Sequence, residues 1–216
     1  MKNKKLILFL IILFPSLFWL TLELSTINSK KLPFYGPKIA HGADTTYYTV
    51  DNSLLDQTLS LDTIQFPLYV IAFTENASKI NLANISGLIE YLKYKKEAIQ
   101  HVPVILACGH ATDTTGKPNG QPASIKKQAG LSNPNVYELG FDQAHYQALV
   151  NTNYFKEKPY YIGNTFLVLI DKKRHIRGYY DGQFVSEVKR LIDEYKHIRL
   201  KEEQKNLLNT NKIESK

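Results

Sequence analysis

The chain has 216 residues, of which 44% are hydrophobic and 22% charged, a composition typical of one folded domain with additional terminal segments. Its formal net charge is +7, but no basic stripe with interleaved aromatic residues occurs, so we do not expect nucleic-acid binding. The single cysteine, Cys108, excludes an intramolecular disulfide, a metal site built on two cysteines and a two-cysteine redox cycle within one chain.

The N-terminus has the pattern of a membrane segment. Lys2, Lys4 and Lys5 form a basic start, and the stretch 6–22 that follows contains no charged residue. As a helix this stretch nearly crosses a hydrocarbon core of about 30 Å. A cleaved signal peptide and a retained anchor both fit this pattern. We favour the anchor, because the stretch is long for a signal peptide and no small-x-small cleavage site follows Leu22.

This interpretation divides the chain into four parts. Residues 1–24 are the membrane anchor or signal segment, 25–46 a linker, 47–205 the folded domain and 206–216 a polar, frayed tail. The positive-inside rule then predicts a single-pass protein of the inner (cytoplasmic) membrane, with its domain on the extracytoplasmic side. The expected anchor residues are Leu6, Phe9, Ile12, Phe14, Phe18 and Trp19.

The first half of the domain predicts a strand, a helix and a second strand. Residues 66–74 are almost all apolar and β-branched or aromatic, as in a strand buried on both faces. Residues 78–96 follow with one mostly apolar face at helical spacing. Residues 102–108 form a second apolar strand, which ends at Cys108.

The second half predicts a long loop and then a hairpin with a terminal helix. Residues 109–134 are rich in Gly and Pro, with a short helix expected near 125–129. A short strand (136–139) and a short helix capped by Asp142 follow. Residues 166–170 and 175–180 read as hairpin strands, and 184–205 as an amphipathic helix. This element order predicts an α/β, thioredoxin-like fold with a mixed central sheet flanked by helices, preceded by the N-terminal hydrophobic helix.

At this point the residues resemble a known family. Residues 166–182 (FLVLIDKKRHIRGYYDG) and the helix segment 187–193 are similar to the SCO/SenC family, thioredoxin-like proteins that help assemble the copper centre of cytochrome c oxidase. The segment 32–37 (LPFYGP), Phe73-Thr74 and Asp113-Thr114 add to the resemblance. It implies a respiratory oxidase subunit as partner and copper as the family's metal.

The resemblance also implies which positions should carry the chemistry. The family uses a Cys-x-x-x-Cys pair after the first core strand and a distant His, a ligand set that suits Cu(I). Here the corresponding positions are Asn76, Ile80 and Gly163 (or its neighbour Asn164). None supplies a thiolate or an imidazole. The copper and redox site is therefore expected to be degenerate, with no cofactor, and the protein to be a non-catalytic assembly or docking factor.

Other residues offer alternatives. Cys108 and His110 lie two residues apart and would suit a copper chaperone or a thiol-based redox protein, although a lone thiol and imidazole need a third ligand. The simpler interpretation is a semi-buried Cys beside a loop His. Glu75 and Asn76, with Asp113 and His110, would form either a polar binding patch or an ordinary solvated loop. One-cysteine peroxidase activity is disfavoured, because the region 76–80 has no thiol.

Overall fold

The computed structural model describes residues 4, 13–21, 32–41, 44–51, 53–56, 68–76, 82–110, 124–159 and 167–214. The chain divides into two compact units, Met1–Leu32 and Pro33–Lys216. In the first, residues 13–21 are helical, and Phe14, Phe18 and Trp19 are exposed. Leu6, Phe9 and Ile12 lie outside the described residues. Within the described ranges, no helix has both the length and the apolar character that a membrane crossing requires.

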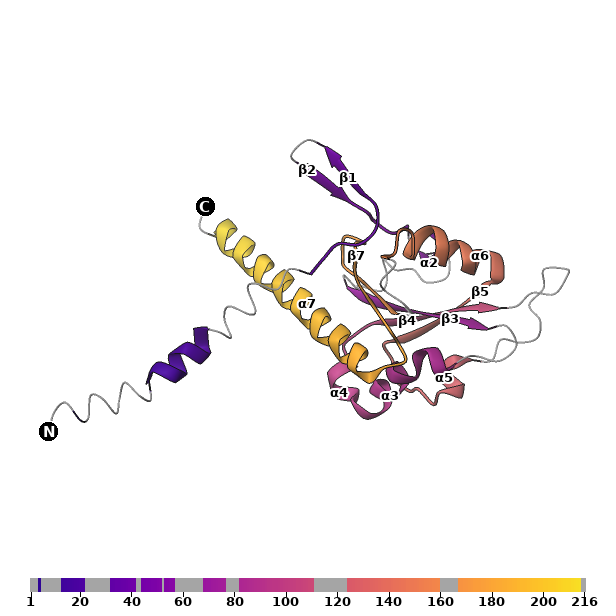
Figure 1. Cartoon of the computed structure of the whole chain (residues 1–216), viewed down its shortest axis with the longest axis horizontal. Helices are drawn as coiled ribbons and strands as arrows, with labels where there is room; N and C mark the ends of the chain where they lie inside the picture. The colour runs from indigo at the N-terminus through magenta and orange to yellow at the C-terminus, as the bar shows by residue number, and fades with distance from the viewer. Residues whose placement is uncertain are drawn as a thin grey trace. The chain divides into compact units, whose positions relative to one another are not determined.

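The second unit is built on a five-stranded mixed sheet (Figure 1). Its order is β5-β4-β3-β6-β7. The strands are β3 (Tyr69–Asn76), β4 (Val104–His110), β5 (Val136–Asp142), β6 (Leu167–Ile170) and β7 (Ile176–Tyr180). β3, β4 and β5 are parallel, whereas β6 and β7 return as an antiparallel hairpin beside β3. The predicted mixed sheet of a thioredoxin-like fold is therefore confirmed.

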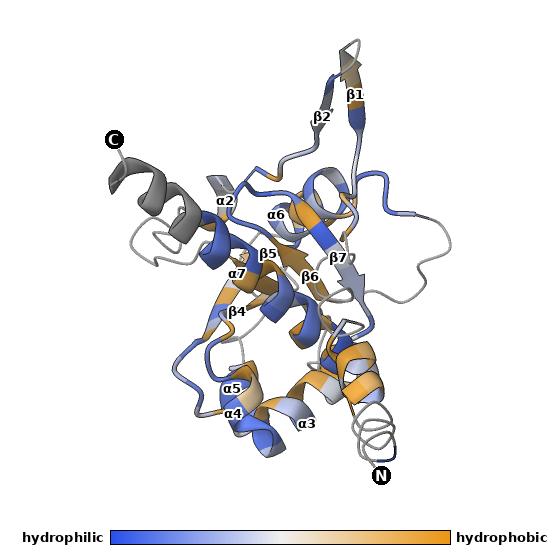
Figure 2. Cartoon of the chain, turned by 90° about the vertical axis from the view of Figure 1, so that its left-hand side faces the viewer, coloured by the Kyte–Doolittle hydropathy of each residue, from blue (hydrophilic) through white to orange (hydrophobic). Residues whose placement is uncertain are grey.

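Helices cover both faces of this sheet. On one side Figure 1 shows α3 (Ser86–Tyr94), α4 (Lys96–Ile99) and α5 (Ile125–Gln128), and on the other α2 (Ser53–Asp56) and α6 (Gln143–Ala148). A short turn, η1 (Leu82–Ile85), leads into α3, and a π-helical turn, η2 (Leu149–Tyr154), continues α6. The long helix α7 (Val185–Glu214) packs against α3. This two-sided cover explains why β3, β4 and β6 are apolar throughout most of their length; Figure 2 shows the central strands largely in hydrophobic colours.

An aromatic cluster fills the core beneath α6. The ring of Phe73 lies 5.2 Å from the rings of Tyr154 and Phe155, at the tilted angles that aromatic pairs favour. The buried hydroxyl groups also find partners. The Tyr179 hydroxyl donates to the backbone oxygen of Tyr154 at 2.7 Å, and the hydroxyls of Tyr69 and Tyr154 lie 3.2 Å apart. Much of the tyrosine content is thus used inside the fold.

Three boundaries differ from those predicted. The expected linker contains a β-hairpin, β1 (Lys38–His41) with β2 (Asp44–Tyr47), because Phe34 stacks on Tyr47 at 4.1 Å and holds the hairpin base. The helix expected over 78–96 breaks at Lys95, whose φ of −117° and ψ of 42° are not helical. α7 meets no Gly or Pro and continues to Glu214, through most of the segment expected as a polar, frayed tail.

Candidate functional site

The three parallel strands end side by side. Asn76, His110 and Asp142 are the last residues of β3, β4 and β5, and the strand register places His110 opposite both of the others. In open α/β sheets, ligands bind outside the carboxyl ends of the parallel strands. We call these three residues, with His145 of α6, the carboxyl edge. Asn76 and His110 thus belong to strands rather than to the loops expected from the sequence. The ends of the three strands bring these positions together at one edge of the sheet.

Cys108 lies behind this edge, inside the sheet. It pairs in register with Thr74 on one side and Gly140 on the other, and the residue is only 1% exposed. Burial raises the pKa of its thiol, and the nearby Glu138 charge raises it further, while a hydrogen bond with Thr74 opposes the shift. A reactive cysteine needs the reverse, an exposed thiolate with a lowered pKa. The environment favours an inert, protonated thiol.

The Glu138 carboxylate is used to cap α5. It accepts hydrogen bonds from the Ser124 hydroxyl at 2.7 Å and from the backbone N–H of Ile125 at 2.6 Å. Lys126 adds a longer backbone bond of 3.3 Å, and its ammonium group donates to the Val136 carbonyl at 2.7 Å. Local sequence patterns do not predict this pairing, because Glu138 lies 13 residues after Ile125 and in a different element. These contacts fix α5 against the sheet.

Gly109 explains part of the spacing between Cys108 and His110. A Cβ atom at this position would lie 2.6 Å from Cγ of Tyr146, which packs on the sheet from α6. Real Cβ atoms do not approach so closely, so only glycine allows α6 to sit at this depth. The Cys-Gly-His run therefore reflects helix packing as well as any site chemistry.

Asp142 and His145 form the one ion pair found here among the described residues. Asp142 caps α6, as predicted, by accepting the backbone N–H of His145 at 2.9 Å, and its other oxygen contacts Nδ1 of the same residue. These hydrogen bonds hold the pKa of the Asp142 carboxyl below its usual value. A carboxylate that orients an imidazole is a common catalytic device, but both side chains here are well exposed, at 38% and 60%. His145 was not predicted to belong to the site.

The residues present do not fit a copper ion. Asn76 carries a weakly donating amide where the sequence resemblance implies a thiolate, and burial of the one thiol, Cys108, favours its protonated form. Among the residues that the structure describes, no group of three or more His, Cys, Asp or Glu side chains lies close enough to hold a metal. Ile80, Gly163 and Asp113 lie outside the described residues. The assignment of Ile80 and Gly163 as degenerate ligand positions therefore rests on the sequence alone.

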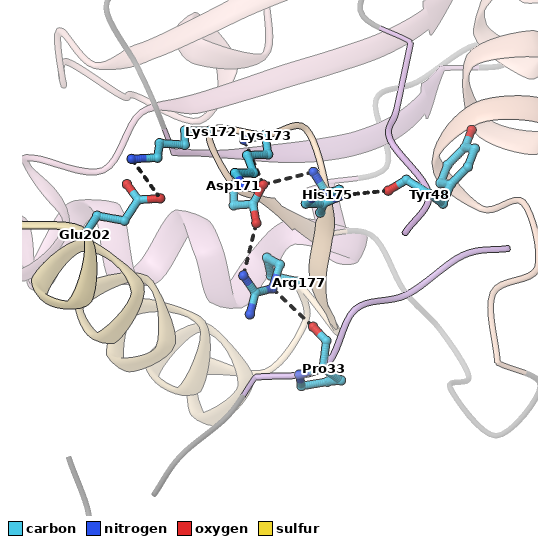
Figure 3. A network of polar contacts seen from close by, with 8 residues as sticks. All are labelled: Pro33, Tyr48, Asp171, Lys172, Lys173, His175, Arg177 and Glu202. Carbon is cyan, nitrogen blue, oxygen red and sulfur yellow. Dashed lines mark hydrogen bonds and ion pairs between the residues drawn. The ribbon is translucent and has the colours of Figure 1, made fainter. Parts of the chain in front are cut away.

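A second polar network lies at the β6–β7 turn (Figure 3). Asp171 accepts the backbone N–H groups of Lys173 and His175 at 2.9 and 3.0 Å and pairs with Arg177 at 3.0 Å. The His175 Nδ1 atom lies 2.9 Å from the Tyr48 carbonyl oxygen, so this nitrogen carries the proton. Arg177 also donates to the Pro33 carbonyl at 3.2 Å. The network ties the segment 33–48 to the β6–β7 hairpin, which supports a packing role for His175.

Comparison with known proteins gives structural neighbours only. No protein-family model matches the chain, and neither does any curated protein sequence. The chain is similar to a SCO1/SenC family lipoprotein from Bacillus anthracis str. Ames, at 14% identity and a TM-score of 0.46, over 78% of this chain and 98% of that one. It is also similar to Bradyrhizobium japonicum ScoI with copper bound, at 15% identity and a TM-score of 0.39, over 62% and 88% of the two chains.

A third solved structure is BsSco, described as a member of the Sco family of cytochrome c oxidase assembly proteins. It shows 15% identity and a TM-score of 0.42, over 76% of this chain and 95% of that one. Similarity of this degree does not by itself assign a chain to a family. The SCO/SenC family, which the sequence resembles, is also the family of these three solved structures.

Proposed function

We propose that this protein is a divergent SCO/SenC-like protein, tethered to the membrane by its N-terminal segment, that serves as a non-catalytic docking or assembly factor for a respiratory cytochrome c oxidase. One observation carries the proposal. At the end of β3, where the resemblance places a thiolate ligand, the chain has Asn76, while its sole cysteine is 1% exposed inside the sheet. The scaffold is present and the accessible sulfur is not.

The membrane tether and the extracytoplasmic location belong to the same proposal. The uncharged stretch 6–22 behind three lysines supports them, as does the exposure of Phe14, Phe18 and Trp19 along residues 13–21. Apolar side chains of this size need a partner surface, and a bilayer supplies one. Fractionation of cell membranes, with alkaline extraction, tests the tether directly.

The alternative function is a copper chaperone or thiol-based redox protein that uses Cys108 and His110. One observation supports it, because Cys108 and His110 both belong to β4 and the strand register pairs His110 with Asn76 of β3. The chemistry weighs against it. Copper binding and disulfide exchange both require the thiolate, which the burial of Cys108 disfavours.

Complementation of a deletion strain separates the two functions. A docking factor predicts that deletion lowers cytochrome c oxidase activity and that the Cys108→Ser chain restores it as well as the natural chain does. The copper or redox function predicts that Cys108→Ser fails. Cys108→Ala is the matched control for a packing defect, because a failure of both variants with low protein levels indicates misfolding rather than lost chemistry. Normal oxidase activity in the deletion strain would contradict the proposal itself.

Restoring the missing ligands tests the scaffold. We expect the combined variant Asn76→Cys, Ile80→Cys and Gly163→His to bind Cu(I) at one equivalent, while the natural chain and the single Asn76→Cys variant bind it far more weakly. The measurement is competition with a Cu(I) chelator. Failure of the folded triple variant to bind copper would mean that these positions do not converge as the resemblance implies.

A further inference from the structure

Lysines gather on the surface where α3 gives way to α4. Lys93, Tyr94, Lys95 and Lys96 are consecutive and all exposed, and Tyr94 is 78% exposed. Lys127 of α5 is exposed on the same side of the sheet (Figure 1). We call these five residues the lysine patch.

The break between α3 and α4 produces this display. Four consecutive residues of a continuous α-helix cover most of its circumference, so at least one would turn toward the core. Here the backbone leaves the helical conformation at Lys95, and the buried Leu92 and Ile99 hold the chain on either side. Residues 93–97, which lie between these two, are therefore all exposed.

The patch extends from α3 across to α5. Cε and Nζ of Lys93 both lie 4.0 Å from the position that a Cβ atom would take at Gly130, just after α5. Lys93, Tyr94, Gln128 and Ala129 line one shallow groove between the two helices. Lys93, Tyr94, Lys95 and Lys96 also line a second open hollow, so Lys93 and Tyr94 border both.

The charge of this area is not neutralised by nearby residues. Four lysines face two carboxylates of the same surface, Glu90 and Glu97, which leaves two net positive charges. No ion pair joins any of the four lysines to another residue in the described part of the chain. Arg177, in contrast, is held by Asp171 at 3.0 Å. The lysines are therefore available to an external anion.

We propose that the lysine patch docks the domain on an anionic phospholipid surface. The inference rests on the proposed membrane tether, which keeps the domain close to the bilayer, so that weak attraction suffices. Flexible lysine side chains can each reach a lipid headgroup. An exposed tyrosine suits the membrane interface, where its ring is partly buried and its hydroxyl stays in contact with water. Two open, shallow hollows favour an extended surface over a single small anion. An acidic protein face is the competing partner.

The expected size of the effect follows from the number of charges. Each lysine near an anionic surface strengthens binding about fivefold. The combined variant Lys93→Gln, Lys95→Gln and Lys96→Gln should therefore weaken docking about a hundredfold, and salt should weaken the natural chain, since the screening length is only about 8 Å at physiological ionic strength.

The test uses the full chain with a fluorophore beside the patch. Cys108→Ser removes the natural thiol, and Gln128→Cys carries the label; Thr45→Cys, on the exposed hairpin away from α3 and α5, is the matched control. Each chain is reconstituted in phosphatidylcholine vesicles with and without phosphatidylglycerol, and nitroxide-labelled lipid serves as quencher. We expect quenching at position 128 only with phosphatidylglycerol, reversal by salt and loss in the triple glutamine variant. Position 45 should not respond.

The outcomes separate this inference from the tether. Equal quenching in both lipid compositions overturns the lysine patch as a lipid site, and is the result expected if its partner is an acidic protein. Quenching that persists in the triple glutamine variant also overturns it. Retention of the chain on neutral vesicles is read separately and tests the anchor. A chain that is not retained there, yet is quenched by anionic lipid, supports the patch and contradicts the tether.

Discussion

The burial of Cys108 makes a quantitative prediction about thiol reactivity. The residue is 1% exposed and lies in β4, which pairs with β3 on one side and β5 on the other. Because strand side chains point out of the plane of the sheet, an alkylating reagent reaches the sulfur only after the elements packed over its face of the sheet move away and open the central strand. Opening a central strand requires a free energy close to that of global unfolding, about 5 kcal/mol or more. We therefore expect alkylation of the folded chain to be at least about a thousandfold slower than that of the unfolded chain.

The rate should also depend on pH through stability. Burial raises the pKa of Cys108 in the folded state above its value of about 8.5 in an unfolded chain. A group shifted in this direction contributes stability that is fully present below the unfolded pKa and is lost as the pH rises toward the folded pKa. Protection from alkylation should therefore hold up to about pH 8 and decline above it.

The assay is maleimide labelling followed by mass spectrometry, with the chain in urea as the reference for full reactivity. Lys173→Cys in a Cys108→Ser chain is the matched control, since position 173 is exposed and should react at nearly the unfolded rate. If Cys108 of the folded chain reacts within tenfold of the reference at pH 7, the reasoning is wrong, and the thiol becomes a credible nucleophile or copper ligand.

Three substitutions test the packing that holds the site in place, each by urea unfolding. Gly87→Ala should destabilise by about 1–3 kcal/mol although alanine favours helices, because its Cβ would lie 2.6 Å from backbone at the start of α7; a gain in stability would contradict this. Asp171→Ala should cost about 3 kcal/mol by removing the carboxylate that pairs with Arg177 and accepts two backbone N–H groups, and an unchanged midpoint would show that the network does not contribute to stability. Tyr180→Phe should cost about 1–3 kcal/mol by removing the hydroxyl that donates to buried Glu194 at 2.6 Å; a neutral result would mean that water replaces it.

The core strands were predictable because their local sequence alone indicates that they are buried. Residues 102–108 and 166–170 are apolar on both faces, which only a sheet covered on both sides requires. Asp142 was predictable as a cap because its hydrogen bond reaches only three residues along the chain. The break at Lys95 was not predictable from the sequence. The apolar spacing of a helical face continues across residue 95, and the interruption depends on tertiary packing.

The site was less predictable, because it depends on register. Cys108 is buried rather than at an exposed strand end because β4 continues to His110 and pairs there with both β3 and β5. The contact between Glu138 and α5 likewise joins elements that local patterns cannot align. The resemblance to the SCO/SenC family named the positions where ligands were missing, but only the structure placed His145 beside Asp142 at the carboxyl edge.

Three polar groups near the carboxyl edge already have hydrogen-bond partners inside the domain. Asp142 accepts the backbone N–H of His145, Glu138 caps α5, and the Thr74 hydroxyl donates to the Ala107 carbonyl at 3.3 Å. These bonds fix α5 and α6 against the sheet. The deciding experiment for this chain is complementation by Cys108→Ser, because that substitution removes the sole thiol without changing any of these three residues.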